Sequence, residues 1–351
     1  MLQSSKKEQL LKPPALRPGD CIGICSPSLP GHIFLKSKFD KGIAFLFSQG
    51  FRVKIGELTK SAVSQGYRTG TAIQRADEFN QLYQSEDVSA ILFTIGGSNS
   101  SSLLPYLDYE YISAHPKIIS GFSDVTSIHA ALNKNCKLVT FYGPALIPSL
   151  GTHPKPDRFT WGCFLQQTGY HGTFRKYVFP CPPKYTNQFI DARNANWTKI
   201  KRSFKKNKGW QALRKGTARG PLFSYNLNTL VSLAGTPYFP DLRNAILCLE
   251  QMNTSMAQEE RQYTQLRLMG VLNEISGLII SKPEHFDDTN ATISFPELLL
   301  EILPSRTRYP VAYNFDCGHT HPMLTIPQGI KALFSVTESV ALEQLACGVT
   351  F

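Results

Sequence analysis

The sequence predicts an α/β protein with two domains: an N-terminal domain built on a parallel sheet, and a smaller, mostly β C-terminal domain. Three observations lead to this prediction. Short apolar runs alternate with helix-like segments through the first half, this alternation ends near residue 152, and apolar strands resume after a basic segment. A length of 351 residues suits two domains. We expect an α/β domain at 1–165, a connecting basic segment at 166–220 and a C-terminal domain at 221–351.

The first half carries the alternation of strands and helices that is typical of a parallel sheet with helices on both faces. Such sheets bind ligands beyond the carboxyl ends of their strands. Gly96-Gly97 and Ser123 both follow predicted strands, so one site could gather them. In chain order we expect a strand at 20–26, a helix at 39–49, a strand at 51–55, a helix at 72–84, and strands at 88–95, 117–119 and 138–142.

The second half is less regular. Residues 153–184 are rich in proline and aromatic side chains and show little periodicity, which indicates a connection. No internal repeat or low-complexity tract interrupts the chain. After the basic segment we expect a helix at 226–233, a strand at 245–250, a charged helix at 258–270, and strands at 275–281, 311–315 and 331–336.

The most informative stretch runs from Lys117 to His129. An apolar run ends in Gly-Phe-Ser-Asp and then changes to helical spacing, which predicts a strand, a sharp turn and a helix with Ser123 in the turn. A serine there exposes its hydroxyl beside the positive end of a helix. Val125 occupies the last glycine position of the usual Gly-x-Ser-x-Gly elbow, and a serine that simply caps the helix remains an alternative.

A serine nucleophile needs a base, and the sequence offers two downstream partners. Glu250 ends an apolar strand, and His319 follows Gly318 in a loop. Together with Ser123 they would supply the carboxylate and the base of a triad, whose chain order is immaterial. The alternatives are an exposed strand-end glutamate and a solvated histidine. Gly96-Gly97-Ser98-Asn99 could supply an oxyanion hole, in which each donor contributes about 3 kcal/mol, or could be a simple turn.

Charge is concentrated in one segment. The chain has a formal net charge of +11, and residues 192–220 hold ten Lys or Arg residues without an Asp or Glu. Trp197, Phe204 and Trp210 are interleaved with these cations. The segment could bind a small anionic ligand or be a solvated loop, and without a binding motif we expect no specific nucleic-acid recognition.

Composition argues for a protein of the cytoplasm without a cofactor. No apolar run approaches the length of a membrane span, and the polar N-terminus lacks the apolar region of a signal peptide. None of the eight cysteines forms a CxxC pair, so we expect neither a disulfide framework nor a metal site. Cys317, two residues before His319, more often packs than reacts.

The chain resembles the LD-carboxypeptidase family of serine peptidases, which includes the microcin C self-immunity proteins. The resemblance covers about Leu16 to Ala332, and the matching stretches follow the family order. They are Thr94–Ser100, Leu103–Tyr109, Pro116–Asp124, Thr140–Pro144, Asn226–Leu230, Gly235-Thr236, Leu249-Glu250, Gln265–Arg267, Gly318–Thr320 and Pro322–Pro327.

The resemblance implies a cleft between the two domains, with Ser123 as the nucleophile, Glu250 as the triad acid and His319 as the base. His321 is the alternative base. The family pattern places the oxyanion hole at the backbone N–H groups of Gly97 and Asp124. It also implies a homodimer. Further substrate contacts are expected from Gly96, Ser98, Asn99, Trp197 and Trp210, with packing as the alternative role of both tryptophans and the preferred one for Trp210.

The resemblance implies hydrolysis of the L–D amide bond that releases terminal D-alanine from murein tetrapeptide. Gly-Gly-Ser-Asn, Thr-Phe-Tyr-Gly-Pro and the long basic segment with its tryptophans also fit an immunity-type amidase that cleaves peptidyl- or aminoacyl-nucleotides. A non-catalytic binding protein is a third hypothesis. The chain departs from the family pattern at Ser224-Tyr225 and at Gln251, which leaves substrate preference open.

Overall fold

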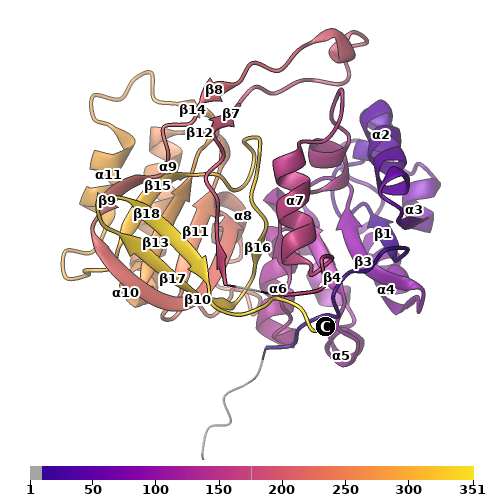
Figure 1. The fold of residues 1–351 in the computed structure, drawn as a ribbon, viewed down its shortest axis with the longest axis horizontal. Coiled ribbons are helices and arrows are strands. Elements are labelled where there is room, and N and C mark those ends of the chain that lie inside the picture. Colours follow the sequence, from indigo (N-terminus) through magenta and orange to yellow (C-terminus); the bar gives the residue numbers. More distant parts are fainter. Residues whose placement is uncertain (1–9, 175) are drawn as a thin grey trace, which may run out of the picture.

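The computed structural model describes residues 10–174 and 176–351, so the first nine residues of the polar N-terminus lie outside the described part of the chain. Figure 1 shows two lobes, one from each half of the sequence, with a long excursion of the chain above them. The predicted α/β architecture with a β-rich second half is confirmed.

The first lobe is built on a six-stranded sheet in the order β16-β5-β4-β3-β1-β2. The pairs among β1 to β5 are parallel, as the alternating sequence predicts. The edge strand β16 comes from the C-terminal half and pairs antiparallel with β5. The strands are β1 (Cys21–Cys25), β2 (Arg52–Ile55), β3 (Val88–Phe93), β4 (Ile118–Gly121), β5 (Phe141–Tyr142) and β16 (Ile326–Pro327).

Helices cover both faces of this sheet. Apolar side chains of α4 and α6 share one core with Ile91 and Ile119, whereas those of α2 and α7 share another with Ile22 and Leu92. Because successive strand residues point to opposite faces, each strand contributes to both cores. The helices of this lobe are α1 (Gly31–Phe34), α2 (Lys36–Ser48), α3 (Glu57–Lys60), α4 (Ala72–Gln84), α5 (Tyr109–Ala114), α6 (Thr126–Cys136) and α7 (Arg158–Gln167).

The second lobe holds an eight-stranded sheet in the order β6-β18-β17-β10-β11-β13-β15-β9. Strands β10, β11, β13 and β15 run parallel in its centre. Its strands are β6 (Tyr177–Val178), β9 (Gln211–Arg214), β10 (Gly216–Asn226), β11 (Ile246–Glu250), β13 (Gly277–Ser281), β15 (Val311–Phe315), β17 (Ile330–Val336) and β18 (Val340–Gln344). The helices of this lobe are α8 (Leu227–Ser232), α9 (Met256–Leu268), α10 (Val271–Glu274) and α11 (Phe295–Ile302).

Two short ribbons lie apart from the sheets. Strands β12 (Met252–Ser255) and β14 (Glu284–Asp287) pair in parallel, and β7 (Lys184–Tyr185) pairs with β8 (Lys205–Lys206). Between β7 and β8 the chain runs across the top of the molecule toward α2 and α7 and then returns (Figure 1).

The structure corrects the expectation of an unbroken connection over residues 153–184. Helix α7 lies within it: Asp157 caps its first turn by accepting from the N–H groups of Phe159 and Thr160, and Trp161 and Phe164 bury its inner face. The expected connecting segment 166–220 also supplies β6, β9 and the start of β10 to the second sheet.

Candidate active site

Ser123 follows β4 in a backbone conformation that non-glycine residues rarely adopt, with φ at 67°. Its N–H donates to the Tyr142 hydroxyl at 3.0 Å, which helps to hold the turn. The hydroxyl does not cap α6, whose cap position makes no side-chain hydrogen bond. A strained serine between a strand and a helix matches the geometry of a nucleophile elbow.

The structure brings Ser123, His319 and Glu250 together. Nε2 of His319 lies 3.0 Å from Ser123 Oγ, and Nδ1 lies 2.6 Å from Glu250 Oε2. The carboxylate is 2% exposed and the imidazole 9%, so both lie inside the protein. Gly318 allows this approach: its φ is 101°, and a Cβ there would lie 2.4 Å from Glu250 Oε2. The alternative base, His321, lines a separate cavity.

Two further groups hold Glu250. Tyr142 donates to Oε1 at 2.5 Å, and the Asn226 amide donates to the same oxygen at 3.1 Å. Burial alone would raise the pKa of Glu250, but the charge of His319 and the hydrogen bonds from His319, Tyr142 and Asn226 together lower it. Sequence reasoning did not assign Tyr142 or Asn226 to the site, although both lie in motifs that carry the resemblance.

The Glu250 carboxylate acts in turn on His319. Burial alone would lower the pKa of His319, but the charge and hydrogen bond of Glu250, with a contribution from Glu284, raise it above its ordinary value. The Phe122 ring packs against the His319 imidazole in an edge-to-face arrangement, with the ring centroids 5.0 Å apart, and restricts it on another side. The base is therefore fixed in orientation.

The loop after β3 lies against the serine turn. A Cβ on Gly96 would lie 3.0 Å from Ser123 Cβ and 3.2 Å from the Asp124 nitrogen, closer than most such contacts, so glycine favours this close approach. Gly97 has a φ of 150°, and a Cβ there would lie 2.3 Å from Ser28 Oγ. Gly96 thus lets the backbone of this loop come close to Ser123 and Asp124, and Gly97 lets it come close to Ser28.

Backbone N–H groups tie the same loop to its surroundings. Ser98 donates to Ser28 Oγ at 3.0 Å, and Asn99 donates to the Asp124 carboxylate at 2.9 Å. The fully buried Arg75 donates to the carbonyl and side-chain oxygens of Asn99. The side chain of Asp124 therefore holds the loop after β3, while the backbone N–H of Asp124 lies in the turn next to Ser123. No pattern in the sequence marked Arg75.

A small polar pocket opens beside Ser123. It encloses about 170 Å³ and contains no charged residue in its lining. Amide and hydroxyl side chains dominate the wall opposite Ser123 and Gly97: Asn226, Asn228, Thr229, Gln251, Asn253, Thr254, Gln258 and Gln262. Such a wall is suited to a ligand that forms many hydrogen bonds and carries little net charge.

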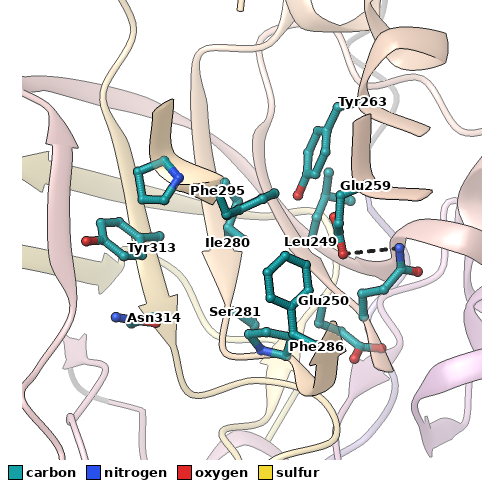
Figure 2. Close-up of a pocket in the computed structure, with 13 residues that line it drawn as sticks. Leu249, Glu250, Glu259, Tyr263, Ile280, Ser281, Phe286, Phe295, Tyr313 and Asn314 are labelled. Atoms are coloured by element: carbon teal, nitrogen blue, oxygen red, sulfur yellow. Dashed lines mark hydrogen bonds between the residues drawn. The ribbon is translucent and has the colours of Figure 1, made fainter. Parts of the chain in front are cut away.

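A second, apolar cavity of about 160 Å³ lies behind Glu250 (Figure 2). Phe286, Phe295 and Tyr313 line it, and Glu259 faces it as a buried carboxyl. Burial raises the pKa of Glu259 to about 7, against the opposing effect of hydrogen bonds from Gln251 and Thr254. Gln251 borders both this cavity and the pocket beside Ser123.

The two tryptophans of the basic segment are both engaged by protein groups. Trp197 is 5% exposed, with the Lys38 ammonium 5.4 Å from its ring and His153 against its edge. Trp210 donates to Asp316 at 2.8 Å and packs on Phe315. Their expected contact with substrate remains a prediction.

Within residues 10–174 and 176–351, no three His, Cys, Asp or Glu side chains are grouped so that they could hold a metal ion. In the same part of the chain, no helix combines the length and apolar character needed to cross a bilayer.

Comparison with known proteins decides the family. Residues 22–143 match the model of the LD-carboxypeptidase N-terminal domain, and residues 219–334 match that of the C-terminal domain. The chain belongs to the LD-carboxypeptidase family. The resemblance stated from the sequence is confirmed, and membership of this family makes the chain a serine peptidase-type enzyme.

Relatives named as self-immunity proteins and relatives named as carboxypeptidases are both similar to this protein over nearly its whole length. The microcin C7 self-immunity protein MccF of Escherichia coli is 39% identical over 319 residues, which cover 89% of this chain and 90% of MccF. The "Probable murein peptide carboxypeptidase" of Bacillus subtilis is 28% identical, over 94% of this chain and 93% of that protein.

Solved structures of MccF share the fold. The ligand-free protein superposes with a TM-score of 0.90 at 36% identity, over 97% of this chain and 100% of that one. A complex of MccF with aspartyl sulfamoyl adenosine superposes with a TM-score of 0.89 over the same shares. These likenesses extend across both lobes.

Proposed function

We propose that this chain is a serine hydrolase that cleaves an amide bond, with Ser123, His319 and Glu250 as its catalytic triad. The observation that carries the proposal is the continuous chain of contacts from Ser123 Oγ through the His319 ring to Glu250, with distances of 3.0 and 2.6 Å. Both lie within the range in which a nucleophile, its base and the orienting carboxylate operate.

In this mechanism His319 takes the proton of Ser123 as the hydroxyl attacks the amide carbonyl. Glu250 stabilises the imidazolium that forms. The N–H groups of Gly97 and Asp124 would bind the oxyanion of the tetrahedral intermediate, each contributing about 3 kcal/mol. His319 then protonates the leaving amine, and a water molecule hydrolyses the acyl-enzyme by the reverse sequence. No metal ion takes part in any of these steps.

For the substrate, we favour an aminoacyl- or peptidyl-nucleotide conjugate over the murein tetrapeptide that stood first in the sequence-based reasoning. MccF, which is crystallised with aspartyl sulfamoyl adenosine, shares 39% of its residues with this chain, against 28% for the murein relative. The murein tetrapeptide remains the second candidate because that relative also covers both domains. A cytoplasmic location and a homodimer stay predictions.

The test incubates the purified protein with aspartyl sulfamoyl adenosine and, separately, with murein tetrapeptide, and follows each product by mass spectrometry. Ser123→Ala should abolish turnover, whereas Ser232→Ala, an exposed serine on α8, should leave it unchanged. Cleavage of the adenosine conjugate would support the favoured substrate, and D-alanine release alone would select the murein peptide. Turnover of neither, or turnover that survives Ser123→Ala, would contradict the proposed mechanism.

A further inference from the structure

The apolar cavity behind Glu250 has the size and the position of a binding site for a small molecule. It lies at the carboxyl ends of the parallel strands β11, β13 and β15, where sheets of this kind bind ligands. Its volume of about 160 Å³ is close to that of an engineered cavity of about 150 Å³ that binds benzene. Phe286, Phe295 and Tyr313 are only half-buried, so a small molecule can reach the cavity on their side.

Aromatic rings form much of the wall of this cavity (Figure 2). Phe295 packs against Tyr263 and Phe286, with ring centroids 6.0 and 5.8 Å apart, and Tyr313 adds a fourth ring. The faces of aromatic rings attract cations, because the ring quadrupole places negative charge there. The lining contains no lysine, arginine or histidine. The walls therefore suit an apolar body that carries positive charge.

Glu259 places a carboxyl group without a cationic partner in this cavity. It is 4% exposed, and its Oε1 accepts from Gln251 Nε2 at 3.4 Å, which is a long hydrogen bond. Among the described residues, no lysine, arginine or histidine forms an ion pair with Glu259. The other carboxylate of the lining, Glu250, is held by the triad contacts described above. A buried carboxylate without a cation costs stability, which a cationic ligand would offset.

The same surroundings disfavour an anion. Helices α9 and α11, which supply part of the lining, both begin with capping boxes, formed by Ser255 with Gln258 and by Ser294 with Glu297. These side chains occupy backbone N–H groups that could otherwise bind an anion at the start of a helix. An anion would therefore meet two carboxyl groups and no positively charged side chain in the lining. A neutral apolar molecule would fill the space but leave Glu259 without a cation.

We propose that this cavity binds a small organic cation, in which an ammonium group pairs with Glu259 and an apolar body lies between the aromatic rings. The bound cation competes with Gln251 for the Glu259 carboxylate. Gln251 also lines the pocket beside Ser123, so the second ligand acts on a residue that borders the candidate active site. The inference goes beyond the proposed hydrolysis and stands whether or not that hydrolysis is correct.

Calorimetric titration of the wild-type protein with benzylamine and with benzyl alcohol at pH 8 tests this site. The two probes have nearly the same shape, but only benzylamine carries a cation, so it should bind at least tenfold more tightly. Glu259→Gln should remove this preference, because the amide keeps the size of the side chain but not its charge. The matched control is Glu260→Gln, a neighbouring glutamate of α9 that is exposed and does not line the cavity, and it should keep the preference.

The pH dependence of binding is a second measurement. Burial, with a contribution from Glu250, raises the pKa of Glu259 to about 7, so the affinity for benzylamine should rise about tenfold between pH 5 and pH 8 as Glu259 ionises. The other titratable groups near Glu259 keep their charge in this range, because the pKa of Glu250 is lowered and that of Tyr263 is raised. Binding of benzyl alcohol should not change with pH.

Three outcomes would overturn the cation site. They are equal affinities for the two probes, a preference for benzylamine that survives Glu259→Gln, and the absence of binding by either probe. Equal affinities would leave the cavity as an apolar space without a cation site. None of these results depends on turnover, so hydrolysis of a substrate and binding of the cation are tested separately.

Discussion

Tyr142→Phe tests whether the hydroxyl between Ser123 and Glu250 supports the candidate site. The hydroxyl is fully buried, accepts from the Ser123 N–H at 3.0 Å and donates to Glu250 Oε1 at 2.5 Å. A hydrogen bond to a charged group contributes about 1.5–3 kcal/mol, and an unpaired buried N–H costs about 1–3 kcal/mol. Because one hydroxyl serves both partners, we expect the free energy of unfolding to fall by about 3 kcal/mol.

The effect on turnover should be smaller than the effect on stability. Asn226 still donates to Glu250 Oε1, and His319 still contacts Oε2, so the carboxylate keeps its charge and most of its orientation. We expect kcat to fall about tenfold, which corresponds to about 1.4 kcal/mol of transition-state stabilisation. Urea unfolding measures the first quantity, and release of product from the substrate that is turned over measures the second.

Tyr225→Phe is the matched control. Tyr225 is also a fully buried tyrosine, but its hydroxyl has no hydrogen-bond partner among the described groups. Removing an unpaired hydroxyl is neutral or stabilising, so this variant should unfold at the same or a higher urea concentration. Equal stabilities for the two variants, or an unchanged kcat for Tyr142→Phe, would refute the reasoning.

Three further predictions follow from the same contacts. Glu250 raises the pKa of His319, and a general base must be neutral, so kcat/KM should rise with pH around a pKa above 6.5. Glu250→Gln should shift this rise in kcat/KM to lower pH and reduce kcat about 10⁴-fold. Arg75→Lys replaces a planar fork that holds Asn99, so a kinetic assay should show kcat falling at least tenfold with little change in KM. Glu259 has a pKa of about 7 in the folded protein against an ordinary value of 4.5, so the folded protein loses stability as the pH rises between these values. Glu259→Gln should therefore be more stable than the wild type at pH 8, by about 3 kcal/mol. Urea titrations should show this difference shrinking toward pH 5.

Regular elements could be predicted where one physical signal dominated. Helix α4 was expected at its observed bounds, because its apolar residues keep helical spacing. In the structure, Thr71 and Gln74 also form a capping box at its start. Strand β15 was likewise expected at Val311–Phe315. The long strand β10 was not predicted at all, because Gly216, Gly220 and Pro221 suggest a turn. Pairing with β17 on one side and β11 on the other holds it extended, and neither partner is near in sequence.

The candidate site was predictable only in part for a related reason. Ser123, Glu250 and His319 each follow or end a predicted strand, where a polar residue is noticeable. Tyr142 also ends a strand, but an aromatic side chain after an apolar run is typical of a core residue. Its role arises from register: β5 pairs with β4 so that Tyr142 lies opposite Gly121, two residues before Ser123. Such a role depends on strand pairing, which a single sequence does not specify.

The basic segment shows why a count of charges does not identify a binding site. Its cations have unrelated environments. Arg214 donates to backbone carbonyls at the edge of the second sheet, Arg193 pairs with Asp191 in solvent, and Arg202 lines a cavity of about 610 Å³. Lys38, a buried cation whose ammonium lies 5.4 Å from the Trp197 ring, belongs to α2 and lies outside the segment altogether. An anion site requires positive charge that the protein leaves unbalanced, and that property is set by burial and by missing partners rather than by composition.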